Sequence, residues 1–215
     1  MAGILDLLNS DIGKSIISGI AGSTGQDAQK TGSVLTMALP VLMKAMERNA
    51  STQEGAEGLM GALKKHDGGI LDNLGDLFNG GVGEDVMNDG SKILGHILGE
   101  KETGVEQVIS QKTNLDSGAV GSILKTAAPI LMGVLGKQSQ QQNVQQPSDL
   151  MGVLGGLLGG SKTKTEQGFL EKILDADGDG SIIDDVAGMV LGGSSSGQKS
   201  GGLLGGLLGG LFGKK

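Results

Sequence analysis

The residues with the clearest chemistry lie in the run Asp175-Ala-Asp177-Gly-Asp179-Gly180-Ser181. Carboxylates at the first, third and fifth positions of a tightly coiled loop face one centre, and Gly180 permits the sharp turn at the sixth. Calcium is a hard cation that takes about six to eight oxygen ligands, whereas magnesium keeps waters and needs strict octahedral geometry. The spacing therefore predicts one site for Ca²⁺.

The second half of this loop departs from a standard EF-hand. Position twelve, normally a bidentate glutamate, is Val186, and the chain has no second loop of this kind. The pattern resembles the shortened loops of dockerins and related bacterial calcium modules, in which the exiting helix supplies a late carboxylate. Either Asp184 or Asp185 fills that role. The predicted metal ligands are Asp175, Asp177, Asp179, Ser181 (through its carbonyl), Asp184 and Asp185.

Charge in the same segment favours a bound cation. Residues 171–186 hold six acidic side chains and one lysine, a net of −5, out of −7 for the whole chain. Without a cation these carboxylates repel one another, so metal-binding energy becomes folding energy. Helices over 167–174 and 182–191 are expected to position the loop. The alternative is an Asp/Gly turn that caps a helix without metal.

Composition argues against most other kinds of site. The chain has no Cys, two His, no Trp or Tyr and three Phe, so thiolate, disulfide and three-histidine sites are excluded. An acidic chain with so few aromatic rings is a poor nucleic-acid binder. Because neither a nucleophile elbow nor a phosphate-binding loop is found, we expect a protein that is not an enzyme.

The remainder of the chain predicts an all-α fold. Apolar residues recur at intervals of three and four, and no stretch alternates as a strand does. The expected helices are Ile4–Leu8, Ile12–Ile20, one from Asp27 to Asn49, one from a capping box at Ser51–Glu54 to His66, Ile70–Phe78, Asp85–Leu98, Glu102–Gln111, and one from Asp116 to about Gly136.

Two of the expected helices are copies of one another. The twelve residues from Gly32 match the twelve from Gly121 at seven positions, with an offset of 89. This repeat predicts a duplicated helical unit with pseudo-twofold character. Each copy contains a proline, Pro40 or Pro129, which is expected to kink its helix. The kink either wraps the helix round a core or shapes a binding groove.

Four motifs occur in order along the first 137 residues: Ser23-Thr-Gly-Gln-Asp27, Arg48-Asn-Ala-Ser-Thr-Gln-Glu-Gly55, His66-Asp-Gly-Gly-Ile-Leu-Asp72 and Gly90-Ser-Lys-Ile-Leu-Gly-His-Ile-Leu-Gly99. Together they resemble a widespread bacterial family, domain of unknown function 937. The related YidB-like proteins resemble mainly residues 118–136. The resemblance implies an all-helical fold and no assigned biochemical activity.

The chain divides by composition into four parts. Residues 1–137 are the expected duplicated domain, and 138–165 a linker containing a Leu/Gly block at 150–160. Residues 166–191 are the calcium module, and 192–215 a flexible Gly/Leu tail. The block at 201–213 repeats the earlier one and precedes two lysines. It is expected to be a flexible tail, to self-associate, or to contact a membrane surface.

Histidine provides few further candidates. His66 ends a helix, where an imidazolium is favoured, and His96 lies among apolar residues, where a hydrogen-bonded ring at the core boundary is expected. A catalytic or metal role for either stays open.

We expect a non-enzymatic binding or scaffold protein whose partners are calcium and, through the Leu/Gly blocks, itself or another protein. The alternative is a membrane-active, secreted or injected protein. Because no signal peptide or apolar span is evident, a cytoplasmic location is expected, with non-classical export left open.

Overall fold

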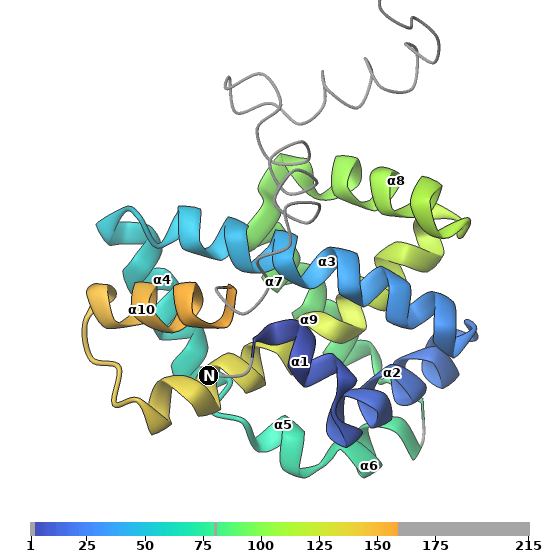
Figure 1. Ribbon diagram of the computed structural model, residues 1–215, viewed down its shortest axis with the longest axis horizontal. Coiled ribbons are helices and arrows are strands. Elements are labelled where there is room, and N and C mark those ends of the chain that lie inside the picture. The colour runs from blue at the N-terminus through green and yellow to red at the C-terminus, as the bar shows by residue number, and fades with distance from the viewer. Residues whose placement is uncertain (1–2, 80, 159–215) are drawn as a thin grey trace, which may run out of the picture.

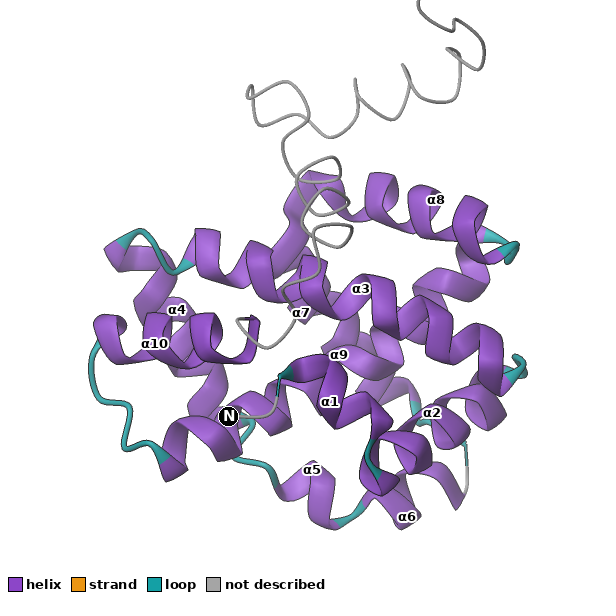
Figure 2. Ribbon diagram, in the orientation of Figure 1, coloured by secondary structure: helices purple, strands orange, loops and turns teal. Residues whose placement is uncertain are grey.

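The helices of the first half lie close to the positions that the apolar periodicity of the sequence predicted. The computed structural model describes residues 3–79 and 81–158, and these contain helices but no strand (Figures 1 and 2). In the first half α1 spans Ile4–Asn9, α2 Asp11–Thr24, α3 Ala28–Asn49, α4 Gln53–Lys65, α5 Gly69–Asp72 and α6 Leu74–Asn79. In the second half α7 spans Glu84–Leu98, η1 Gly99–Lys101, α8 Glu102–Thr113, α9 Ser117–Gln141 and α10 Pro147–Leu158.

The two long helices α3 and α9 organise the fold. Each begins at the predicted aspartate cap: Asp27 accepts from the Lys30 amide at 2.9 Å, and Asp116 from the Ala119 amide at 2.9 Å. These caps satisfy amides that have no partner within the helix. The shorter helices surround this pair, with α8 at one edge and α5 and α6 at the other (Figure 1).

Both long helices contribute to one apolar core. Pro40 and Pro129 lie buried inside continuous helices. The largest fully buried side chains come from both halves of the fold: Ile4, Ile20, Leu35, Leu42, Met43, Met46, Leu94, Ile109, Ile123, Leu124, Met132 and Leu135. Burial of such side chains supplies most of the driving force for folding.

The proline in α9 coincides with an unusually close helix contact. Pro129 has no N–H to give to the carbonyl of Lys125, one turn earlier. Helix α7 passes so near this carbonyl that a side chain at Gly90 would collide with it. Glycine is therefore required at position 90 for α7 and α9 to pack together.

Three predicted boundaries were wrong. The N-cap of α4 is Thr52, whose hydroxyl accepts from Gly55, whereas the Ser51 hydroxyl donates to the Arg48 carbonyl. The single helix expected over 70–78 is interrupted at Asn73, so α5 and α6 are separate. Helix α9 runs five residues beyond Gly136, because the polar residues after it still suit a helix.

The Leu/Gly block at 150–160 also differs from the expected linker. Its residues up to Leu158 belong to α10, which packs on α3 and α4 (Figure 1). Leu150, Val153, Leu154 and Leu157 are buried there. The tertiary surface offered by α3 and α4 supplies the partner that this glycine-rich helix needs.

One described helix is long and apolar enough to cross a membrane. It is α9, and 78% of its most apolar stretch is buried inside the fold. That burial is the situation expected of a core helix in a globular domain.

Candidate binding groove

An open groove lies where α1 meets α2, beside α5, α6 and the last turns of α9. Its volume is about 510 Å³, within the range of about 300–1,000 Å³ that is common for small-ligand sites. Its apolar lining comes from all of these elements: Leu7, Ile12, Leu71, Leu74 and Val134. The groove is therefore built by residues that are far apart in sequence.

Ile12 is the most conspicuous side chain of the groove. It is 58% exposed, and it is the only large apolar side chain in the described residues that is exposed. It lies on α2 next to the buried stripe of Gly13, Ile16 and Ile20, and so points away from the core. Its exposure was not predicted from the sequence, although its position beside that stripe was a usable signal.

The rim of the groove carries charge of both signs. Asp11 and Asp72 line it together with Lys137, and the Lys137 ammonium lies 3.1 Å from a carboxylate oxygen of Asp72. The other polar residues along it are Ser15, Gln138 and Gln141. The groove thus has an apolar floor with a net negative rim.

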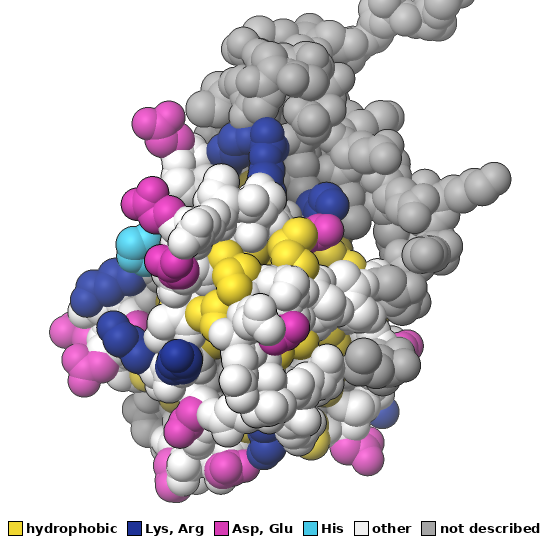
Figure 3. Space-filling model, turned by 90° about the vertical axis from the view of Figure 1, so that its left-hand side faces the viewer, with side chains coloured by type: hydrophobic (Ala, Val, Ile, Leu, Met, Phe, Trp, Pro, Cys, Tyr) yellow, Lys and Arg dark blue, Asp and Glu magenta, His cyan; other side chains and the backbone are white. Residues whose placement is uncertain are grey.

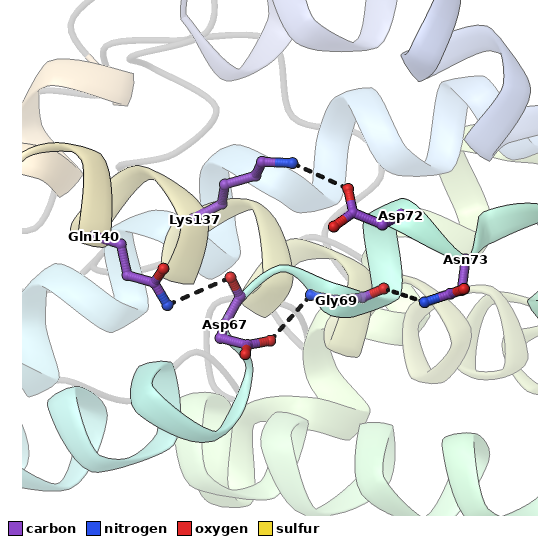
Figure 4. A network of polar contacts seen from close by, with 6 residues as sticks. All are labelled: Asp67, Gly69, Asp72, Asn73, Lys137 and Gln140. Atoms are coloured by element: carbon purple, nitrogen blue, oxygen red, sulfur yellow. Dashed lines mark hydrogen bonds and ion pairs between the residues drawn. The ribbon is translucent and has the colours of Figure 1, made fainter.

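The wall formed by α5 is held in place by a network of polar contacts (Figure 4). The Asp67 carboxylate accepts from the Gly69 amide at 3.0 Å, and the Asn73 amide donates to the Gly69 carbonyl at 2.9 Å. From α9, Gln140 donates to the Asp67 carbonyl at 3.5 Å. These contacts fix the segment from His66 to Asp72, one of the motifs identified from sequence.

Glycines on α9 allow this segment to approach. A side chain at Gly136 would collide with the carbonyl of His66, and one at Gly133 would meet the side chain of Ile70. Gly68 adopts a left-handed conformation with φ of 102°, which favours glycine. The wall of the groove therefore depends on three glycines.

The two histidines lie in different surroundings. His66 ends α4 as predicted, and its Nε2 lies 3.6 Å from a carboxylate oxygen of Asp89, an ion pair when the ring is protonated. His96 is exposed, so the prediction of a ring at the core boundary was wrong. The cause is its angle on α7, since Ile93, Leu94, Ile97 and Leu98 take the buried positions.

Helix α10 shows how a Leu/Gly segment binds to this fold. Its four buried residues follow the spacing i, i+3, i+4 and i+7 and face α3, α4 and α9. A side chain added at Gly152 or Gly155 would enter open space. The leucine face therefore makes the contact, and these glycines do not.

The side of the molecule that carries α4 and α10 is shown in Figure 3. Apolar side chains form a strip across the middle of it, and basic and acidic side chains are spread around its outline.

One carboxylate at the α8–α9 contact has a perturbed pKa. Burial raises the pKa of Glu106 above its ordinary value of 4.5, and the negative charge of Glu102 raises it further, while Lys125 lowers it. The carboxylate lies over Gly121 of α9. It stands outside the groove, and its burial at this helix contact disfavours the charged form of the carboxyl group.

The predicted calcium ligands lie outside the described residues. Within residues 3–79 and 81–158 no group of three or more His, Cys, Asp or Glu side chains could hold a metal ion. The predicted site at Asp175, Asp177, Asp179, Ser181, Asp184 and Asp185 therefore stays a prediction.

Comparison with known families places the chain in one of them. Residues 6–138 match the model of a bacterial protein family of unknown function, DUF937. The match covers more than half of the chain, so the protein belongs to this family, as its four motifs predicted. It includes α2 to α8 and most of α9, and with them every residue that lines the groove except Gln141. Neither curated proteins nor solved structures give a match.

Proposed function

We propose that this protein is a non-enzymatic binding or scaffold protein whose groove takes an apolar segment of a protein partner. The observation that carries the proposal is the exposed Ile12 side chain on the floor of a 510 Å³ groove. A concave surface that is lined mostly by apolar side chains, with a few polar groups to fix orientation, is the usual form of a binding site. The charged rim would orient the partner, while the apolar floor would supply affinity.

We also propose that the helical unit is a duplicated one. Thr24 and Thr113, 89 residues apart, each donate to the carbonyl four residues earlier, and Gly25 and Asn114 each end their helix in a left-handed conformation. Helix α4 follows α3 and packs on α9, while α10 follows α9 and packs on α3. These exchanged contacts support a pseudo-twofold arrangement.

The partner proposal is tested by photo-cross-linking in bacterial cells. A photoreactive benzoylphenylalanine replaces Ile12 in the full chain, and the control carries it at Gln111, an exposed position on α8. A defined protein adduct from position 12 that the control does not give is the expected result. Equal adducts from both positions would contradict a specific groove.

The calcium-stabilised module is the second part of the proposal. Its support is the spacing of Asp175, Asp177 and Asp179 before Gly180. Titration of the full chain with calcium chloride in a calorimeter is expected to show one site, which Asp175→Ala abolishes. Asp85→Ala, at an exposed position on α7, is the matched control. If the chain without substitutions bound no calcium, the proposed site would be refuted.

The alternative of a membrane-active protein now depends on residues 201–213. The leucine face of the earlier block is buried in α10, so that block presents no apolar face to lipid while docked. Leakage of anionic vesicles by the full chain, compared with Leu208→Asp, tests the alternative. Leakage that this substitution abolishes would favour it over the binding proposal.

A further inference from the structure

We infer that the groove is occupied, in the same chain, by the second Leu/Gly segment, residues 204–213. The inference rests on the proposed binding function of the groove, and it adds that the chain supplies its own competing ligand. A partner would then have to displace this segment to bind. Four observations carry the inference: the likeness of the segment to α10, the character of the groove, the charges at its rim and the length of the chain.

The first observation is the likeness of the segment to a helix that does dock. Residues 204–213 match residues 150–159 at seven of ten positions, with an offset of 54. The four buried residues of α10 correspond to Leu204, Leu207, Leu208 and Leu211. The segment therefore carries the same leucine face, with glycines at the positions where α10 has open space.

The second observation is that the groove offers what a leucine face requires. The floor of the groove is apolar, it lies against the last turns of a proline-containing helix, and the exposed part of Ile12 has no cover in the described fold. Covering apolar surface is worth about 25 cal/mol per Å². Glycine costs about 1 kcal/mol per helical residue, so the segment would form a helix only when docked and would bind weakly enough to be displaced.

The third observation is charge complementarity. Lys214 and Lys215 follow the segment directly, and Asp11 lies at the rim of the groove. The Asp11 carboxylate is fully exposed and lies 3.9 Å from Lys14, which is itself 70% exposed. Such a surface pair is worth little, so Asp11 is available to a second lysine. The basic end of the segment and the net negative rim therefore attract each other.

The fourth observation is chain length. Forty-five residues separate Leu158, the end of α10, from Leu204. A chain of that length can span on the order of 150 Å when extended, whereas a domain of this size has a radius of gyration of about 15 Å. The segment can therefore reach any face of its own domain, at an effective concentration on the order of millimolar.

Other occupants fit less well. The surface on α3 and α4 that matches the segment is already covered by α10, which a short loop holds in place. A second copy of the chain would have to bind at micromolar concentrations against the millimolar concentration of the tethered segment. Docking within one chain is therefore favoured over exchange between chains.

The experiment uses a fluorophore that the chain lacks. Because the sequence has no Trp or Tyr, Phe212→Trp gives the purified full chain a single tryptophan at the end of the segment. Docking is expected to shift its emission to the blue, independently of protein concentration. Ile12→Asp and Leu208→Asp should each abolish the shift. Gln111→Asp and Gly209→Asp, matched in charge, should leave it unchanged.

A second measurement guards against misfolded variants. In a chain without native cysteines, Ser15→Cys at the rim combined with Gly213→Cys is expected to form a disulfide within one chain. Far-UV circular dichroism of each variant checks that its helices are retained. An emission maximum typical of exposed tryptophan in every variant, together with no disulfide, would overturn the inference.

Other outcomes also decide the matter. A shift that grows with protein concentration would show a second copy as the occupant, and one that survives Ile12→Asp would show a different surface. Either result overturns docking in the groove of the same chain. In cells, Leu208→Asp frees the groove, so cross-links from position 12 to a partner should persist or increase. Cross-links to a partner without a tryptophan shift would support the proposed binding function and contradict docking of the segment.

Discussion

The helices α3 and α9 share sequence and caps but differ on one face. At the offset of 89, Gly133 and Gly136 of α9 correspond to Lys44 and Glu47 of α3. The glycines allow the segment from His66 to Asp72 to pack on α9, whereas Lys44 and Glu47 form a pair of 2.7 Å at the surface. The groove thus lies beside the proline helix that has small residues at these two positions, which indicates that side-chain volume there decides which segment can pack against the helix.

The contact between α8 and α9 differs in a similar way from the corresponding contact between α2 and α3. Ile17 of α2 packs over Gly32 of α3, and Glu106 of α8 lies over Gly121 of α9 at the same offset. An apolar contact in one half is therefore a carboxylate contact in the other. The raised pKa of Glu106 is the electrostatic consequence of that exchange.

The largest expected effect on stability tests whether α10 is an integral part of the fold. Helix α10 packs on α3 in the way that α4 packs on α9. Leu154→Ala removes a side chain that is fully buried and should cost about 2–5 kcal/mol of unfolding free energy. Gly155→Ala, in open space, should be neutral or stabilising by up to about 1 kcal/mol. Urea unfolding followed by circular dichroism measures both. Equal small effects would show that α10 contributes little.

The next effect tests the glycines of α9. Gly136→Ala places a methyl group against the carbonyl of His66 and should destabilise by about 1–3 kcal/mol, as overpacking does. Glu47→Ala at the corresponding position of α3 should change stability by less than about 0.5 kcal/mol. Thermal unfolding of the two variants compares them. If Gly136→Ala left the melting temperature unchanged, the segment from His66 to Asp72 could move away from α9 to make room for the methyl group.

A smaller effect is expected from removing the ion pairs made by Lys137 of α9 and Lys44 of α3. Lys137→Met removes the contact with Asp72 at the groove, and Lys44→Met removes the contact with Glu47. Exposed pairs contribute about 0–1 kcal/mol, so stability should hardly change in either variant. Cross-linking from position 12 should fall only in Lys137→Met. A fall in both would indicate a general effect of charge.

The smallest effect concerns pH. Because its pKa is raised in the folded state, Glu106 binds its proton more tightly there, so its deprotonation lowers stability as pH rises from about 4.5 through the folded-state value. Glu106→Gln should therefore raise the melting temperature at pH 7 and leave it unchanged at pH 4. Melting curves at the two pH values test this, and a gain of equal size at both would point to packing instead.

Much of the helical framework could be predicted from sequence because its determinants are local. Asp27 and Asp116 cap the next amides along the chain, and apolar spacing marks the buried faces of α3 and α9. Boundaries were missed where local signals compete. Ser51 and Thr52 are both acceptable caps, and the hydrogen bond from Thr52 to Gly55 decided between them.

The groove itself could not be predicted, because no local signal specifies it. Ile12, Asp72 and Lys137 belong to three helices, α2, α5 and α9, which are far apart in sequence and meet only in the tertiary structure. A leucine/glycine segment is equally ambiguous in isolation, since its glycines disfavour a helix in water. The first block became α10 because the fold presents a complementary apolar surface.

Sequence by itself determined the helical class, the two proline helices, the family and the calcium-type spacing at Asp175–Gly180. Only the tertiary structure decided that Ile12 stays exposed, that His96 faces outward and that the leucines of α10 are buried. The physical reason is the distance along the chain over which each kind of interaction acts. Caps and periodicity act within a few residues of one helix, whereas the exposure of a side chain depends on which distant helices come to cover it.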